Sequence, residues 1–173
     1  MAPGEVRIVT VSTETAQAVL SLSSYRPGLP RLAGLTWGAE DLSAAVGAIS
    51  NRDDDGQLSP LYKMADALCV CASAAAGVQA IDTLFADFRD PAGLAASCRT
   101  SRRRGYSGKI AIHPDQVDVI NAEFSPTPAE RAAAQKVVDA FAAQPLLGTL
   151  SIDGVMYDMP HLRQARRTLG LDA

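Results

Sequence analysis

Several absences narrow the class of protein that this sequence encodes. No run of eighteen apolar residues occurs in its 173 residues, so no transmembrane helix is predicted. Residues 1–4 lack the charged, apolar and small-residue order of a secretory signal. The 16 Lys and Arg against 19 Asp and Glu do not provide the concentrated positive surface that nucleic acid requires. We therefore expect a cytoplasmic protein that binds neither membranes nor nucleic acid.

Cysteine is scarce, and a glycine-rich phosphate-binding fingerprint is missing. The three cysteines are Cys69, Cys71 and Cys98, and none has the spacing of a zinc-ligand pair. Side chains two residues apart on a helix point to different sides, so Cys69 and Cys71 cannot bind the same metal ion. We expect all three to be buried, reduced thiols. The missing fingerprint argues against a dinucleotide-binding fold.

Apolar runs do alternate with helical stretches along the first two thirds of the chain. Such an order predicts a parallel sheet with right-handed crossovers, either doubly wound or closed as a barrel. A complete eight-unit barrel needs about 250 residues, so four units look like half of one. The four runs expected to form strands are 6–11, 32–37, 78–85 and 109–113.

Helix boundaries are marked by capping residues, proline and glycine. A capping residue followed by Pro, and later a Gly, predicts helices over 60–76 and 91–104. Thr127 and Glu130 form a capping box for a helix that should reach about residue 144.

The residues after 144 show a different pattern, two short extended pieces followed by a helix. Asp153 and Gly154 predict a tight turn between two short extended pieces. Asp158 follows, where it could cap a last helix through Leu169.

Carboxylates stand where two of the expected strands end. Glu14 follows the first strand, and Glu40 and Asp41 follow the second. Neighbouring strands lie about 4.8 Å apart, so acids from two such ends can converge on one cation. Glu40 and Asp41 should face different ways, and we expect one of them to share a metal with Glu14. Oxygen-only ligands favour Mg²⁺ over zinc. The alternative is that Asp41 caps a helix beginning at Leu42 while Glu14 is solvated.

Five segments resemble the citrate lyase beta-subunit family, within the larger HpcH/HpaI aldolase and citrate lyase group of TIM barrels. They occur in the family's order and cover nearly the whole chain. The resemblance implies an α/β fold made of parallel β/α units, strands five to eight only, over 1–125, with a C-terminal helical extension over 126–173 that contacts a neighbouring subunit. The segments are STETA at 12–16, GAEDL at 38–42, QAIDTLFADFRD at 79–90, GYSGKIAIHPDQVDVINAEFSPTPAE at 105–130 and DGVMYDMPHLRQARRTL at 153–169.

The same resemblance implies an activity and roles for particular residues. Glu14 and Asp41 match the family's Mg²⁺ ligands, and backbone amides at Ala39, Glu40 and Asp41 match those that hold a substrate carboxylate. Asp158 matches an acid/base residue that reaches a neighbouring subunit's active site. The implied reaction is Mg²⁺-dependent carbon-carbon cleavage of a citryl- or malyl-type 3-hydroxyacyl thioester, carried by coenzyme A or by a protein. Its products are a keto acid of the oxaloacetate or glyoxylate type and an acyl thioester.

The sequence also departs from the family. Gln17 and Ala18 stand where the family often has Arg-Gly. The family's substrate-gripping arginine on strand three and its acidic segment after strand two have no position here. We therefore expect either a homo-oligomer or a complementing half-barrel partner. The alternative to a lyase is a truncated, catalytically inactive half-barrel remnant or an assembly element.

Two further patterns imitate binding sites. Residues 51–56 resemble the start of a calcium-binding loop, but the twelfth position is Tyr62, which cannot supply the bidentate carboxylate. We expect a polar surface loop there. Arg99 and the arginines at 102–104 could clamp the phosphates of coenzyme A, but they close a helix and are expected to complement its dipole.

The sequence suggests roles for three further titratable residues. His113 could border the site or simply precede a proline that starts a helix. His161 is expected to be a surface or packing residue. Asp82 could point into the barrel and order the site, or be a satisfied structural carboxylate.

Overall fold

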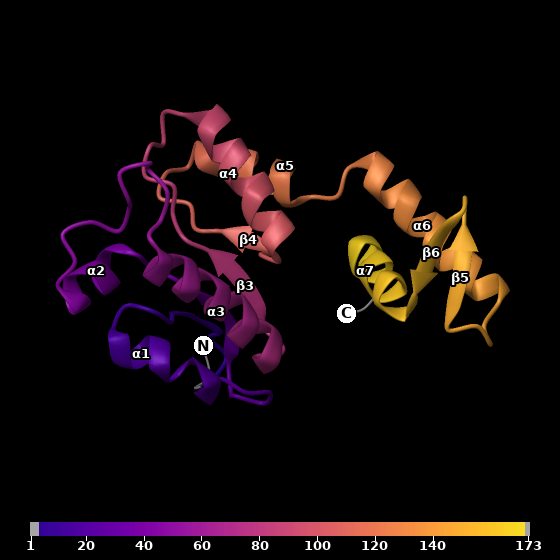
Figure 1. Cartoon of the computed structure of the whole chain (residues 1–173), viewed down its shortest axis with the longest axis horizontal. Helices are drawn as coiled ribbons and strands as arrows, with labels where there is room; N and C mark the ends of the chain where they lie inside the picture. Colours follow the sequence, from indigo (N-terminus) through magenta and orange to yellow (C-terminus); the bar gives the residue numbers. More distant parts are fainter. Residues whose placement is uncertain (1–3, 172–173) are drawn as a thin grey trace. The chain divides into compact units, whose positions relative to one another are not determined.

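The computed structural model describes residues 4–171, which belong to two compact units (Figure 1). The first unit is Met1–Phe124 and the second is Ser125–Ala173. Within residues 4–171, no helix has the length and apolar character needed to cross a membrane.

The first unit is an α/β unit built on a parallel sheet. Its four strands lie in the order β1-β2-β3-β4, and every neighbouring pair is parallel. The order of elements is β1 (Ile8–Val11), α1 (Ala16–Leu20), the 3-10 turn η1 (Leu22–Ser24), β2 (Leu32–Thr36), α2 (Glu40–Val46), α3 (Pro60–Ala76), β3 (Gln79–Asp82), α4 (Pro91–Arg104), β4 (Gly108–Lys109) and α5 (Gln116–Phe124).

Helices α3 and α4 begin and end where the sequence predicts. Helix α3 follows Ser59 and ends at Gly77, whose φ of 69° is left-handed. Helix α4 begins after Asp90, whose side chain accepts a hydrogen bond from the Gly93 amide at 2.8 Å. It ends at Gly105, with a φ of 107°. A left-handed residue satisfies the last carbonyls of a helix, and glycine adopts that conformation without steric cost.

The strands are shorter than the apolar runs that predict them: β3 covers 79–82 of the run 78–85, and β4 shares only Lys109 with the run 109–113. Pairing stops soon after Lys109, where the Ile110 amide donates to the Asp82 carbonyl at 3.0 Å. The Ile112 amide donates instead to the side chain of Gln116, at 2.9 Å. Pro114 has no amide hydrogen to continue a ladder. The expected strand over 109–113 is therefore wrong beyond Lys109, and the remaining residues form a loop.

Helix α3 covers one face of the sheet, against β2 and β3. Leu35 on β2 and Tyr62 on α3 are among the fully buried side chains of this core. Cys69 on α3 and Cys98 on α4 are buried as expected, but Cys71 is exposed. Position 71 lies about 200° around α3 from position 69, so the expectation that all three thiols are buried is wrong for Cys71.

The opposite face of the sheet exposes apolar side chains near its β1 edge. Thr10 pairs with Leu35, and Leu35 faces the helices. The alternating residues Val9 and Val11 must point to the other face, where they are 52% and 43% exposed. Among the described strands, β1 lies at the edge of its sheet and pairs with β2 alone.

The second unit contains a hairpin as well as helices. Its elements are α6 (Pro128–Ala143), β5 (Thr149–Ile152), β6 (Val155–Asp158) and α7 (Met159–Leu169). The capping box of Thr127 and Glu130 is formed, as predicted. Asp153 and Gly154 both have positive φ and join β5 to β6 as a two-residue turn.

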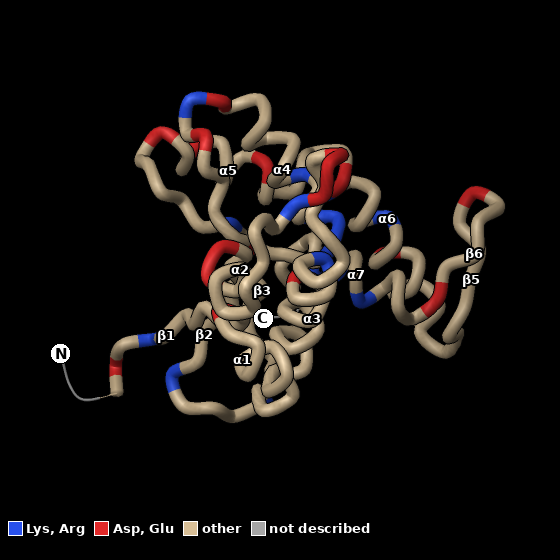
Figure 2. The backbone as a smooth tube through the Cα atoms, turned by 60° about the vertical axis from the view of Figure 1, so that its left-hand side comes forward, with Lys and Arg blue, Asp and Glu red and all other residues tan. Residues whose placement is uncertain are grey.

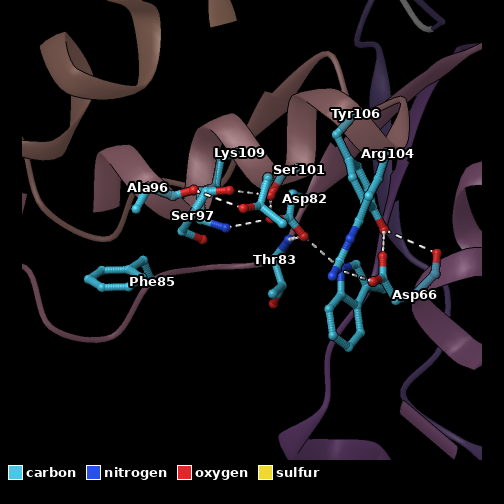
Figure 3. Close-up of polar contacts among 12 residues, drawn as sticks. Asp66, Asp82, Thr83, Phe85, Ala96, Ser97, Ser101, Arg104, Tyr106 and Lys109 are labelled. Atoms are coloured by element: carbon cyan, nitrogen blue, oxygen red, sulfur yellow. Dashed lines mark hydrogen bonds and ion pairs between the residues drawn. The ribbon is translucent and has the colours of Figure 1, made fainter. Parts of the chain in front are cut away.

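Charged residues are spread over several elements of the chain (Figure 2), and Asp and Glu mark the first turn of α2. Two acidic side chains of the first unit are buried: Asp66 and Asp82 are each 6% exposed. Figure 3 shows the polar contacts around both.

Asp82, at the end of β3, is a fully bonded structural carboxylate. Its Oδ1 accepts from the Trp37 indole and from the Thr83 amide, both at 2.8 Å. Its Oδ2 accepts from the Ser101 hydroxyl and from the Lys109 ammonium, both at 2.5 Å. These contacts join the ends of β2, β3 and β4 to helix α4. Of the two roles considered for Asp82, the structure supports the structural one.

Asp66, on α3, has partners at the end of α4. Tyr106 donates its hydroxyl to Oδ1 at 2.6 Å, and Arg104 donates to Oδ2 at 2.9 Å. Burial raises the pKa of the Asp66 carboxyl above its ordinary value, while both of these contacts oppose the rise. Burial and the Asp66 contact also raise the pKa of the Tyr106 hydroxyl.

We predict that Asp82→Asn lowers the free energy of unfolding by about 3–5 kcal/mol, because it leaves the Lys109 ammonium buried without a counter-charge. Lys109→Met added to it should recover part of the loss, since no unpaired charge remains. Urea denaturation measures both of these variants and Lys109→Met alone, with Asp115→Asn, at an exposed carboxylate, as the control. A double variant as unstable as the sum of the singles would show that the two groups do not interact.

We also predict that the 173-residue chain self-associates through the exposed face and edge at β1. Sedimentation velocity over a range of concentrations should show species larger than a monomer. Val9→Thr with Val11→Thr should reduce them, because both substitutions remove exposed apolar surface. Val155→Thr, at a valine that is 57% exposed on β6, is the matched control. A compact monomer at every concentration would contradict the prediction.

Candidate functional site

The candidate site lies where the chain leaves β1 and β2. The two strands are parallel and in register, with Val11 opposite Thr36. The pairing continues one residue further, because the Ser12 amide and hydroxyl both donate to the Thr36 carbonyl, at 2.8 and 2.9 Å. The loops that follow β1 and β2 therefore start side by side at the carboxyl edge of the sheet, where α/β folds gather their functional groups.

Thr13 then joins these two loops through its side chain. Its hydroxyl accepts a hydrogen bond from the Gly38 amide at 3.1 Å and lies 3.4 Å from the Gly38 carbonyl, to which it donates. Thr13 is completely buried. Sequence reasoning assigned Thr13 no role, because nothing in the pattern separates one hydroxyl residue of the segment 12–15 from the others.

The acids follow directly after this link. Glu14 is the residue after Thr13, and Glu40 and Asp41 follow Gly38 within three residues. All three carboxylates are exposed. The first turn of α2 contains both Glu40 and Asp41, and its N-cap is Ala39, which forms no side-chain capping bond. The alternative that Asp41 caps a helix beginning at Leu42 is therefore wrong, because the helix begins two residues earlier.

The described residues contain no larger cluster of metal-ligating side chains around these acids. Among residues 4–171, no group of three or more His, Cys, Asp or Glu side chains could hold a metal ion by itself. This applies equally to the loop over 51–56, which closes on itself through a hydrogen bond from the Gly56 amide to the Asp53 carbonyl at 2.9 Å. Tyr62, the supposed twelfth position, is a core residue whose hydroxyl is 2.7 Å from that of Ser43.

Asp158 belongs to the second unit, at the N-cap of α7. Its side chain is 37% exposed, and its Oδ1 lies 2.6 Å from Nδ1 of His161. The Asp158 amide also points at the same nitrogen, at 3.2 Å. Tyr157 contacts the imidazole edge-on, with 5.2 Å between ring centres. Sequence reasoning missed this pairing, although an acid and a histidine three residues apart at a helix start are placed to meet.

The remaining candidates have other partners. Arg99 pairs with Glu123 at 2.7 Å, and Arg104 pairs with Asp66. His113 lies in the loop after β4, stacked on Phe88 with 4.6 Å between ring centres. These contacts account for all three side chains within the first unit and connect none of them to Glu14 or Asp41.

Comparison with known proteins places the chain in a family. The chain is 37% identical over 142 residues to citramalyl-CoA lyase, mitochondrial, of Rattus norvegicus. This alignment covers 81% of the chain and 40% of the rat protein. The chain is 35% identical over 158 residues to (3S)-malyl-CoA thioesterase of Cereibacter sphaeroides, and this alignment covers 90% of the chain and 53% of that protein.

A solved structure has a similar fold. CitE of Mycobacterium tuberculosis, in complex with magnesium, acetoacetate and coenzyme A, matches with a TM-score of 0.79 and 29% sequence identity. The match covers 98% of this chain and 61% of CitE. The chain thus spans about half the length of the curated relatives it matches. Residues 2–114 match the family described as HpcH/HpaI aldolase/citrate lyase, and the chain belongs to that family.

Proposed function

We propose that this chain provides the metal-binding part of a Mg²⁺-dependent carbon-carbon lyase that acts on citryl- or malyl-type 3-hydroxyacyl thioesters of coenzyme A. The observation that carries the proposal is the link between Thr13 and Gly38. It holds together the two segments that bear Glu14 and Asp41, the acids that match the family's metal ligands.

The donors at this edge suit Mg²⁺. Glu14 and Asp41 offer carboxylate oxygens only, and both are exposed. Mg²⁺ is commonly bound through one or two carboxylates and keeps several waters, so two acids are enough. When bound, the ion supplies positive charge that stabilises the oxyanion developing on the keto-acid oxygen.

The substrate carboxylate is assigned to the backbone amides of Ala39, Glu40 and Asp41. Ala39 caps α2 without a side-chain bond, so no capping side chain competes for the amides of the first turn. A helix of seven residues would not by itself indicate an anion site. The assignment depends on the match to the GAEDL segment.

Asp158 is the proposed acid/base residue. It would move the proton at the α-carbon of the acyl thioester. His161 is in direct contact with the Asp158 carboxyl group and restrains its orientation. Donation of Asp158 into a neighbouring subunit's site requires at least two copies of the chain.

The relatives support the substrate class. One is named as a lyase of citramalyl-CoA and another as a thioesterase of malyl-CoA, and CitE was crystallised with magnesium, acetoacetate and coenzyme A. Each of these names concerns a coenzyme A thioester or coenzyme A itself. We therefore propose coenzyme A as the carrier.

A second candidate function is that of an assembly element without catalysis. It is favoured by the apolar face at Val9 and Val11, which the described part of the chain leaves exposed.

We predict that Asp41→Asn abolishes Mg²⁺ binding while leaving the fold intact, because the side chain is exposed and caps no helix. Isothermal titration calorimetry measures binding, and circular dichroism checks the fold. Glu40→Gln, in the same helical turn, is the matched control and should bind Mg²⁺ like the wild type. An unchanged titration for Asp41→Asn would remove Asp41 from the site, and loss of binding in Glu40→Gln would assign the ligand to Glu40.

Activity separates the two candidate functions. The lyase hypothesis predicts release of keto acid from citryl- or malyl-CoA that requires Mg²⁺ and is lost in Glu14→Gln, since that variant lacks one ligand charge. A coupled assay for oxaloacetate or glyoxylate measures the release. Activity that depends on neither the metal nor Glu14 would rule out the mechanism. Mg²⁺ binding without any release would favour the assembly element.

A further inference from the structure

We propose that Thr13 is a positioning residue, which sets the separation of the two loops that carry Glu14 and Asp41. The inference depends on the proposed function, because it assigns Thr13 a task at that metal site. Thr13 touches neither acid through any contact described above. It would act through the backbone of its own loop and that of its partner.

The Thr13 hydroxyl replaces backbone pairing at the point where the strands end. Up to Ser12, the loops are joined as strands are, with the Ser12 amide bonded to the Thr36 carbonyl at 2.8 Å. At the next position, the Thr13 hydroxyl bonds both polar groups of Gly38, accepting from the amide and donating to the carbonyl. A hydroxyl is suited to this task because it combines one donor with two acceptor sites.

The location of this link makes it relevant to a metal. The link is one residue from Glu14 and three residues from Asp41 along the two loops. A side chain that is completely buried has few alternative positions, so the link resists changes in the separation of the loops. Without it, hydrogen bonds would join the two loops only as far as Ser12, and the segments that carry the acids could separate more freely. Groups that orient metal ligands typically change metal affinity by 10–100-fold when they are removed.

Ser12 offers a matched comparison on the same strand end. It is also buried, at 2% exposure, and its hydroxyl also bonds a backbone carbonyl, that of Thr36 at 2.9 Å. Its side chain faces the helices, 3.7 Å from the sulfur of Cys69 on α3. Loss of the Ser12 hydroxyl therefore removes a buried hydrogen bond near the site, but it leaves the bond from the Ser12 amide to Thr36 and the link between Thr13 and Gly38 in place.

The test compares Thr13→Val, Thr13→Ser and Ser12→Ala in the full chain, with Mg²⁺ as the probe. Titration calorimetry gives the dissociation constant for Mg²⁺, and thermal melting without Mg²⁺ gives Tm. We expect Thr13→Val and Ser12→Ala to lower Tm, since each removes a buried hydrogen bond. Only Thr13→Val should weaken Mg²⁺ binding, by about tenfold or more. Thr13→Ser should bind like the wild type, because the hydroxyl is retained.

The outcomes distinguish this inference from the function on which it depends. The positioning role is overturned if Thr13→Val binds Mg²⁺ with wild-type affinity, or if Ser12→Ala loses as much Mg²⁺ affinity as Thr13→Val. Neither result contradicts the proposed metal site. A wild-type chain that does not bind Mg²⁺ overturns the proposed function and the positioning role together.

If Thr13→Val does not fold, amide exchange in the wild type still decides the question. The Gly38 amide should exchange slowly before Mg²⁺ is added, because the Thr13 hydroxyl already binds it. Fast exchange of that amide without Mg²⁺ would overturn the positioning role.

Discussion

The parallel pairing of β1 with β2 is the constraint on which the candidate site depends. Parallel strands end at the same edge of a sheet, so the register that sets Val11 opposite Thr36 also brings the following loops together. Ser12 and Thr13 extend the contact beyond the strands by bonding Thr36 and Gly38. Two acids that are far apart in sequence then belong to adjacent loops, although neither acid needs a buried partner of its own.

A second constraint holds the other half of the sheet. Buried Asp82 accepts from groups at the ends of β2 and β4 and from α4, so one carboxylate joins three strands to a helix. Water replaces these bonds poorly, because the carboxylate is buried. The helix-covered face is therefore rigidly specified. The opposite face has exposed valines at β1, and a chain with such a face and an open edge is suited to contact another polypeptide.

The two units divide the proposed chemistry between them. The first unit bears Glu14, Asp41 and the amides of α2, and the second bears Asp158 beside His161. Cleavage of a carbon-carbon bond beside a thioester needs charge stabilisation at one end and proton transfer at the other. An acid/base residue on a separate unit can be supplied to a neighbouring copy, which would make catalysis depend on assembly.

The sequence by itself determined the alternation of strands and helices, the helix ends at Gly77 and Gly105, the hairpin turn and the family, because these follow from local backbone preferences and ordered motifs. It could not limit β4 to two residues, bury Asp82 among Trp37, Ser101 and Lys109, pair His161 with Asp158, or select Thr13 as the link. Those features depend on which groups from distant segments meet in space. Only the tertiary structure decides that, since hydrogen-bond partners across a sheet leave no periodic signal in the chain.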